Sequence, residues 1–542
     1  MAVLETAAAQ TVFDAFLATA QAAPGNVFLC APRAAGRAYH PDGIELTYGE
    51  TRRAALALRE SYARAGYGHG HRVALLLENR PEFFFHYLAL NALGVSIVPI
   101  NPDYRHDEML YQMDHSEADL AVTIPGRVGD LEAVARDRKL PLPVIDAERF
   151  PAMLPKPRPT PRSGAPGLET ETSLLYTSGT TGRPKGCILS NFYYLNAGAW
   201  YRDLVRLVPG RERILNPLPL FHMNAQAVTA TGAILTANCL AQPERFSPAR
   251  WWQDVVNADA TIIHYLGVMP PLLLNQPPCD EERRHRVRFG VGAGVEPALH
   301  PRFEERFGLP LIEVWGMTET GRLYADVVEP RQVTTRAFGR PFGGLEARVV
   351  DDKDQELPSG AEGELLVRWG GPAGARHGFF SGYLKNAEAT DEAWRGGWFH
   401  TGDVVTQAAD GMLYFVDRKK NIIRRSGENI AAAEVEACLH VHEAVAQVAV
   451  LAVPDDVREE EVMACVVPMP GVSADRALAE TLQAWALDRL AYFKAPGWVL
   501  FLDRLPTTGT QKVQKTQIFP KGEDPRRRAG ALDLRDGKRR RR

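Results

Sequence analysis

Residues 72–102, RVALLLENRPEFFFHYLALNALGVSIVPINP, constrain the fold more than any other part of the sequence. They are typical of a buried strand, then a helix with apolar residues at helical spacing, then a second short apolar strand that ends at Asn-Pro. Two strands that are joined through a helix run parallel in one sheet. The segment therefore predicts a βαβ unit.

The same alternation recurs along much of the chain. Apolar runs of strand length are separated by helix-length segments with polar periodicity, and they occupy residues 118–125, 213–221, 260–266 and 311–316. They predict an α/β body with mostly parallel sheets. Because 542 residues exceed what one ordinary core accommodates, we expect two or more domains.

The pattern changes after Asp351, where short strands broken by Gly and Asp turns indicate a β-rich subdomain. The very polar stretch 417–429 then precedes a compact segment in which helix and strand alternate again. We predict an N-terminal domain over residues 1–417, a small α+β C-terminal domain over 418–520, and a disordered, solvated basic tail over 521–542.

Composition excludes several classes of partner. The net charge of −3 and the pI near 6.6 provide no global basic field for nucleic acid or an anionic membrane, so an anionic partner must be held by a local site. The six cysteines are scattered without metal-ligand or disulfide spacing, which favours a reducing compartment. We find no export signal and no apolar run that could span a membrane, and we expect a cytoplasmic protein.

The loop within LLYTSGTTGRPKGCILS, residues 174–190, is chemically suited to a polyphosphate. Backbone N–H groups of a Gly/Ser/Thr loop can converge on phosphate oxygens, and Lys185 adds charge. The spacing is not that of the common P-loop, because Pro184 stands five positions after Gly179. A mobile surface turn is the alternative reading of the loop alone.

Residues 176–186, YTSGTTGRPKG, resemble the phosphate-loop signature of the adenylate-forming superfamily of acyl-CoA synthetases, peptide-synthetase adenylation domains and luciferases. Further motifs follow in the order of that family, from TYGE at 47–50 to LPTTGTQKVQK at 505–515. The resemblance implies a large N-terminal domain of stacked α/β sheets and a C-terminal domain that rotates between two half-reactions.

The resemblance also implies a nucleotide site. Trp315 would lie against adenine, Thr318 would bond phosphate oxygens and Glu319 would hold Mg²⁺, since Mg²⁺ beside phosphates takes one or two carboxylates. A surface acid is the alternative for Glu319, and a simple turn former is the alternative for Asp403. The implied ATP/AMP-binding residues are Thr177, Ser178, Gly179, Thr180, Thr181, Gly182, Lys185, Ala293, Gly294, Trp315, Gly316, Thr318, Asp403, Arg418 and Lys512.

Three further positions belong to the C-terminal part of the resemblance. Lys512 matches the catalytic lysine, which would stabilise the charge that develops on the carboxylate and the α-phosphate. Lys420 matches the hinge, and Ser426, Gly427 and Glu428 match the loop that faces coenzyme A. The chain departs from the family pattern at Asp417 and Gln511, where most relatives have glycine.

The acid-binding pocket is implied less specifically. The predicted lining is His222, Asn224, His264, Tyr265, Gly267, Gly292 and Met317, with His222 read as a gate or pocket wall and a packed histidine as its alternative. This mixture of polar and aromatic groups favours a short or medium, polar or unsaturated acid over a long alkyl chain. The segment 262–274 resembles bacterial ligases near the crotonobetaine/carnitine-CoA group.

The predicted reaction has two steps. ATP·Mg²⁺ and a carboxylic acid give an acyl-adenylate and pyrophosphate, and coenzyme A then displaces AMP to give a thioester. The catalytic residues would be Lys512, Thr318, Glu319 and His222. The alternatives are loading of a carrier protein, oxidation of the adenylate, and a nucleotide-binding protein that has lost catalysis. The sequence leaves the acid and the oligomeric state open, with a homodimer as one alternative.

Overall fold

The computed structural model describes residues 9–160, 164–177, 183–267, 269–295, 297–418, 422–506, 515, 518–520 and 522–538. It divides into two compact units. The first comprises Met1–Asn101, Met113–Leu175 and Gly186–Asp417, and the second comprises Pro102–Gln112, Tyr176–Lys185 and Arg418–Arg542. Two short segments from the first half of the chain, residues 102–112 and 176–185, are thus grouped with the C-terminal residues. The domains expected from the sequence were contiguous and placed both segments in the N-terminal domain.

A seven-stranded sheet confirms the βαβ unit expected at residues 72–102. Helix α3 (Glu82–Asn91) connects two parallel neighbours, β3 (Arg72–Leu76) and β4 (Ser96–Pro99). The strand order is β18-β8-β7-β4-β3-β5-β6. The remaining strands are β5 (Leu120–Thr123), β6 (Val144–Asp146), β7 (Glu171–Thr177), β8 (Lys185–Ser190) and β18 (Gly382–Tyr383).

An eight-stranded sheet has the order β14-β13-β12-β11-β9-β10-β1-β2. Its strands are β1 (Val27–Ala31), β2 (Ile44–Thr47), β9 (Arg213–Leu215), β10 (Cys239–Ala241), β11 (Ile262–Leu266), β12 (Phe289–Ala293), β13 (Leu311–Trp315) and β14 (Tyr324–Ala325). Strands β9, β11, β12 and β13 run parallel to one another, so their carboxyl ends meet at one edge, and β14 is antiparallel to β13.

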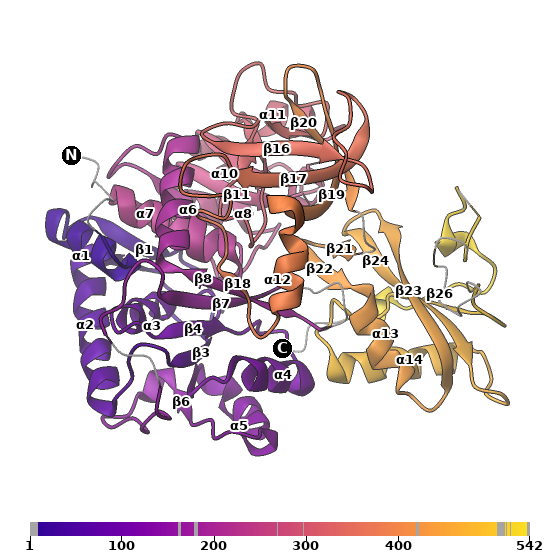
Figure 1. Cartoon of the computed structure of the whole chain (residues 1–542), viewed down its shortest axis with the longest axis horizontal. Coiled ribbons are helices and arrows are strands. Elements are labelled where there is room, and N and C mark those ends of the chain that lie inside the picture. Colours follow the sequence, from indigo (N-terminus) through magenta and orange to yellow (C-terminus); the bar gives the residue numbers. More distant parts are fainter. Residues whose placement is uncertain are drawn as a thin grey trace. The chain divides into compact units, whose positions relative to one another are not determined.

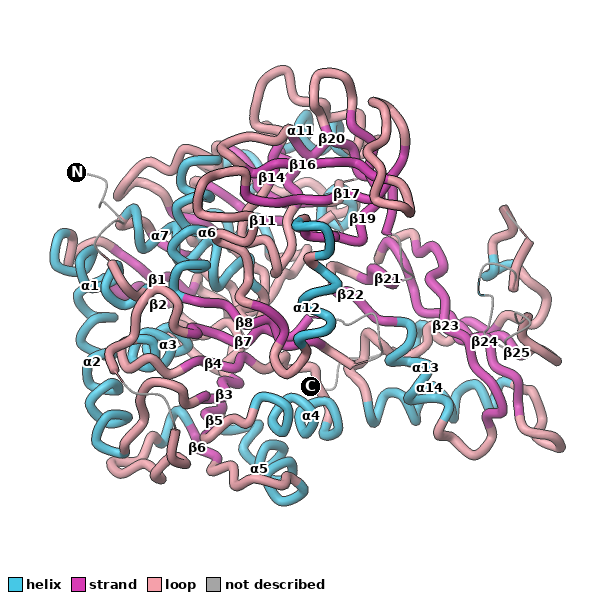
Figure 2. Tube along the Cα trace, in the orientation of Figure 1, coloured by secondary structure: helices cyan, strands magenta, loops and turns pink. Residues whose placement is uncertain are grey.

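Helices accompany the two sheets (Figures 1 and 2). Helix α2 begins at a capping box in which Thr47 and Glu50 satisfy each other's backbone N–H groups, and it ends at Gly66, whose φ of 96° suits glycine. The helices are α1 (Val12–Ala22), α2 (Tyr48–Ala65), α4 (His106–Ser116), α5 (Val128–Asp137), α6 (Asn191–Leu204), α7 (Ala230–Thr236), α8 (Trp251–Asn257), α9 (Met269–Leu274), α10 (Glu281–Arg284), α11 (His300–Phe307) and α12 (Ala387–Ala393). No helix within the described ranges is long and apolar enough to cross a bilayer.

The β-rich subdomain expected after Asp351 begins earlier, because two strands of its five-stranded sheet precede that residue; the strand order is β15-β20-β19-β17-β16. Its strands are β15 (Ala337–Gly339), β16 (Leu345–Val350), β17 (Glu362–Trp369), β19 (Phe399–Gln407) and β20 (Leu413–Arg418). Alternate residues of β19 are buried, so the strand fixes Asp403 on its buried side.

The second unit is built on a sheet of the order β22-β21-β24-β25-β26, with β23 paired to β24. Its elements are β21 (Ile422–Arg425), β22 (Glu428–Ala431), α13 (Ala432–His440), β23 (Val445–Asp455), β24 (Glu459–Pro468), α14 (Arg476–Arg489), β25 (Trp498–Phe501) and β26 (Leu532–Asp533). Val462 and Val466 of β24 belong to one core with α13 and α14, whereas Met463 and Cys465 face a separate core.

The tail differs from its sequence-based prediction. Residues 522–538 do not form a disordered, solvated segment: β26, which Figure 1 labels, pairs with β25, Leu534 is 5% exposed and Lys538 is 8% exposed. The physical reason is that apolar residues alternate with the charges, so that Leu534 enters the core of this unit while Arg535 bonds Asp455. The basic composition alone did not show these partners.

Candidate active site

The strand ends of the eight-stranded sheet bring three predicted segments together in the first unit. Gly267 follows β11, Ala293 ends β12 and Trp315 ends β13. Tyr265 pairs with Gly292 across β11 and β12, and Gly292 pairs with Glu313 across β12 and β13. The predicted adenine loop and acid-pocket residues are therefore neighbours at one edge of the sheet, where α/β sheets bind ligands.

Glycine permits the close approach of these strand ends. A Cβ on Gly267 would lie 2.0 Å from the carbonyl oxygen of Gly294, and Gly294 itself has a φ of 89°. A side chain at either position would move the loop that follows β12. Both glycines were predicted as site residues, and their geometry gives a physical reason for the residue type.

Glu313 connects the loop after β12 to Tyr265, a predicted acid-pocket residue. Glu313 was assigned no role from the sequence. Its Oε1 accepts a hydrogen bond of 2.6 Å from the Tyr265 hydroxyl, and its Oε2 accepts one of 2.8 Å from the Gly294 N–H. Burial raises the pKa of Glu313 above its usual value, while these donors oppose the rise. One partly buried carboxylate thus positions a predicted acid-pocket residue and a predicted nucleotide residue together.

Trp315 lies in an aromatic environment at the end of β13. Its ring stacks on Tyr324 with centroids 5.6 Å apart and lies 6.0 Å from Phe338. Its indole N–H donates a hydrogen bond of 2.9 Å to Oδ2 of Asp403, which is 2% exposed. The two residues predicted to contact adenine and ribose are therefore joined directly.

Glu319 is held by a tyrosine from β18. The Tyr383 hydroxyl donates a hydrogen bond of 2.9 Å to Oε1 of Glu319, and the Cys187 thiol makes a longer contact of 3.8 Å with the same oxygen. Neither donor reaches Oε2, so the carboxylate retains an oxygen for a cation. The described residues contain no group of three or more His, Cys, Asp or Glu side chains that could hold a metal ion.

The loop after Trp315 presents the remaining predicted residues of this motif. Gly316 is exposed, and Met317 and Thr318 are partly exposed. The Tyr193 hydroxyl of α6 donates a hydrogen bond of 2.7 Å to the Thr318 carbonyl oxygen. This bond positions the backbone of Thr318 and does not use its side chain. Tyr193 was not singled out from the sequence, because an isolated tyrosine on a helix carries no motif.

The other acid-pocket candidates occupy different environments. His222 and Asn224 are partly exposed, and Asn224 begins the π-helix η4 (Asn224–Thr229) while its Oδ1 accepts a hydrogen bond of 2.9 Å from Asn216. His264 is 1% exposed, and its ring nitrogen bonds the Tyr201 hydroxyl at 2.8 Å. Burial lowers the pKa of His264 to about 3, so this ring is neutral.

Several other predicted residues belong to the second unit or lie outside the described residues. Thr177 ends β7 and Lys185 begins β8 in the second unit, while 178–182, Lys420 and Lys512 lie outside the described residues. Arg418 ends β20, and its side chain is also outside the description. Ser426 and Gly427 form a turn between β21 and β22 with φ values of 52° and 82°, and Glu428 begins β22.

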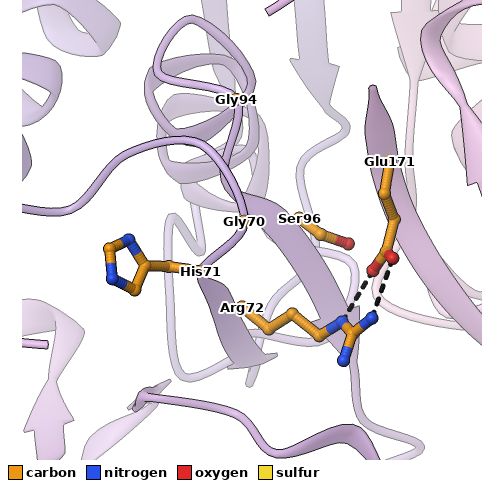
Figure 3. Close-up of a pocket in the computed structure, with 6 residues that line it drawn as sticks. All are labelled: Gly70, His71, Arg72, Gly94, Ser96 and Glu171. Carbon is orange, nitrogen blue, oxygen red and sulfur yellow. Dashed lines mark hydrogen bonds and ion pairs between the residues drawn. The ribbon is translucent and has the colours of Figure 1, made fainter. Parts of the chain in front are cut away.

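A small hollow lies at the amino-terminal ends of three strands of the seven-stranded sheet. It is lined by the first residues of β3, β4 and β7, namely Arg72, Ser96 and Glu171 (Figure 3). Arg72 donates two hydrogen bonds, of 2.7 and 2.9 Å, to the carboxylate of Glu171. Since the only acid and arginine lining it bond each other, we assign this hollow no ligand.

The chain matches the models of two known protein families. The model of the AMP-binding enzyme family matches residues 17–384, and that of the AMP-binding enzyme C-terminal domain matches residues 434–512. Sulfoacetate–CoA ligase of Cupriavidus necator is 32% identical over 491 residues, covering 88% of this chain and 93% of the relative. Crotonobetaine/carnitine–CoA ligase of Proteus mirabilis is 29% identical over 498 residues, with the same two coverages.

A solved structure shares the fold. The o-succinylbenzoate CoA synthetase of Bacillus subtilis superposes with a TM-score of 0.80 at 24% identity, covering 94% of this chain and 98% of that chain.

Proposed function

The chain belongs to the AMP-binding enzyme family, and from this premise we propose that it is an AMP-forming acid–thiol ligase that joins a small carboxylic acid to coenzyme A. One observation supports the proposal most: Trp315 and Asp403 on the nucleotide side, and Tyr265 and Gly294 on either side of Glu313, are neighbours in the first unit. Such a site holds a nucleotide and an acid next to each other, which activation of a carboxylate requires.

In the first step the acid's carboxylate oxygen attacks the α-phosphorus of ATP. The bond between that phosphorus and the bridging oxygen breaks, and pyrophosphate leaves. Asp403 would accept hydrogen bonds from the ribose, and Trp315 orients Asp403 through its indole N–H. Glu319 would hold Mg²⁺ through Oε2, since the Tyr383 hydroxyl donates its hydrogen bond to Oε1, and the metal would neutralise phosphate charge.

In the second step the sulfur of coenzyme A attacks the acyl carbon and AMP leaves. We assign Lys512 to the first step and the turn at Ser426, Gly427 and Glu428 to the second, with Lys420 as the hinge between them. These assignments rest on the motif positions in the sequence.

For the acid we propose a short molecule with a polar or charged group at its far end. The two curated relatives named above act on sulfoacetate and on crotonobetaine or carnitine, which are short acids of this type. The partly exposed His222 and Asn224 offer polar contacts at the proposed pocket.

The test is pyrophosphate and AMP release from purified protein with Mg·ATP against short sulfonated, betaine-type, unsaturated, branched and aromatic acids, each with and without coenzyme A. Pyrophosphate release with one acid, and thioester only with coenzyme A, is the expected result. Pyrophosphate without thioester would identify another acceptor, such as a carrier protein. ATP binding without turnover of any acid would favour a protein that has lost catalysis.

A further inference from the structure

The C-terminal segment is part of the sheet of the second unit although it lies beyond residue 512, where the family model ends. Strand β26 pairs antiparallel with β25, and the Leu534 N–H donates a hydrogen bond of 2.9 Å to the Gly497 carbonyl. The Gln483 amide donates one of 2.8 Å to the Leu534 carbonyl. We refer to residues 532–538 as the C-terminal brace.

The brace ends in a buried lysine. The Lys538 side chain is 1% exposed, and its ammonium donates to the carboxylate of Glu461 and, at 3.0 Å, to the Phe493 carbonyl. Glu461 is fully buried, and its other oxygen accepts a hydrogen bond of 2.8 Å from Arg425. The carboxylate of Glu461 therefore links the end of the chain to the last residue of β21.

A second link reaches the same place through Asp455. Arg535 donates a hydrogen bond of 2.9 Å to Oδ2 of Asp455, whose Oδ1 accepts the N–H groups of Val457 and Arg458. The Arg458 carbonyl in turn accepts a hydrogen bond of 3.1 Å from the Ser426 N–H. The two links thus end at adjacent residues, Arg425 and Ser426.

The turn at this point requires support. Ser426 and the following Gly427 both have positive φ, and a non-glycine residue in that region persists where the surrounding structure holds it in place. The links from the brace fasten the residues that immediately precede Gly427. They add to the backbone pairing of the turn, in which Arg425 pairs with Glu428 of β22 and with Glu459 of β24.

We propose that the C-terminal brace is a positioning element for the second half-reaction: Lys538, through Glu461 and Arg425, and Arg535, through Asp455, hold the turn at 426–428 in the conformation that receives coenzyme A. This inference rests on the proposed function for its chemistry, since the turn is assigned to coenzyme A there. Lys538 is a positioning residue, because it acts on the turn through Glu461.

The experiment uses the full chain and separates the two half-reactions. In Lys538→Met, pyrophosphate release without coenzyme A should stay within about twofold, whereas thioester formation from preformed adenylate should fall about tenfold or more because the turn is displaced. Lys538→Arg should restore most of the thioester step. Arg527→Met is the matched control, because that side chain is 88% exposed in the same segment, and it should change neither step.

Hydrogen exchange of the same variants tests the brace without coenzyme A. Faster exchange of the amides at 425–428 in Lys538→Met, with unchanged exchange in the eight-stranded sheet, supports the proposal. Equal loss of both half-reactions, or unchanged exchange at 425–428, overturns it. If Lys538→Met does not fold, Arg535→Gln makes the same test at the partly exposed second link. Absence of thioester in the unmodified enzyme would overturn the proposed function, and hydrogen exchange would still decide the brace.

Discussion

The indole N–H of Trp315 donates a hydrogen bond of 2.9 Å to Oδ2 of Asp403, a residue 88 positions away in the sequence. The bond joins the end of β13 to the buried side of β19, and it occupies one oxygen of the carboxylate. Asp403 is 2% exposed, so its orientation is set by protein contacts. The proposed ribose contact therefore depends on the proposed adenine contact.

Trp315→Phe should weaken ATP binding. It keeps an aromatic ring but removes a hydrogen bond to a charged group, which is worth about 1.5–3 kcal/mol, so the KM for ATP should rise by about tenfold or more. The measurement is pyrophosphate release at varied ATP and saturating acid. Trp252→Phe is the control, because no hydrogen-bond partner of its indole nitrogen is present among the described residues, and it should leave the KM for ATP within about twofold.

Glu313→Gln should disturb both substrates at once. The neutral amide weakens the bonds from Tyr265 and Gly294, so the KM values for the acid and for ATP should both rise, by roughly three- to thirtyfold. Tyr265→Phe removes only one of the two bonds and should raise the KM for the acid alone. A change in the KM of only one substrate in Glu313→Gln would contradict the proposal that this carboxylate positions both Tyr265 and Gly294.

Tyr383→Phe should alter the requirement for Mg²⁺. The substitution frees Oε1 of Glu319 from its hydroxyl donor and lets the carboxylate rotate, so the Mg²⁺ concentration for half-maximal pyrophosphate release should rise about three- to tenfold. Cys187→Ala is the matched control, since the thiol is a weak donor at 3.8 Å. If both variants keep the Mg²⁺ dependence of the unmodified enzyme, Glu319 does not hold the metal through this arrangement.

Buried histidines should make the first unit less stable in acid. Burial lowers the pKa of His86 to about 3, whereas the unfolded chain titrates near 6.5, so the unfolded state binds more protons between these values. The folded state loses stability as the pH falls below 6.5, by about 2 kcal/mol at pH 5 for this residue. His86→Gln keeps an acceptor for Tyr62 and should show a smaller decrease in Tm between pH 7 and pH 5. An unchanged decrease would contradict the assignment.

The sequence predicts the strand ends but not the contacts between them. Apolar runs such as 260–266 and 311–316 end at polar or glycine-rich positions, so β11 and β13 could be placed with Gly267 and Gly316 just beyond them. The bond from Tyr265 to Glu313 depends instead on the register of three strands, which no local pattern encodes.

The C-terminal segment 522–538 also has contacts that its local sequence does not predict. Composition predicts a solvated segment because basic residues dominate it. Lys538 nevertheless finds Glu461, 77 positions earlier, and Leu534 finds a core built by α13 and α14. Long-range pairing of opposite charges overrode the local preference, and only the three-dimensional structure shows it.

Lys494 gives a prediction for the stability of the second unit. Its ammonium donates hydrogen bonds of 2.9 and 2.8 Å to Glu108 and Glu434, and all three side chains are largely buried. Burial raises the pKa of Glu108, which the ammonium opposes. Lys494→Met would leave two carboxylates facing each other without a cation, at a cost of about 3–5 kcal/mol near neutral pH.

The pH dependence of that loss distinguishes it from a packing defect. Without the ammonium the folded state must protonate the carboxylates, so it binds more protons than the unfolded chain, and stability should fall as the pH rises from about 4.5 to 7. Calorimetry of Lys494→Met at pH 5 and pH 7 makes the comparison, and the destabilisation should be smaller at pH 5. Lys515→Met breaks the more exposed pair with Glu436, whose side chains are 21% and 22% exposed, and should cost about 1 kcal/mol or less at either pH. Equal destabilisation of Lys494→Met at both pH values would show that the lost contacts are apolar.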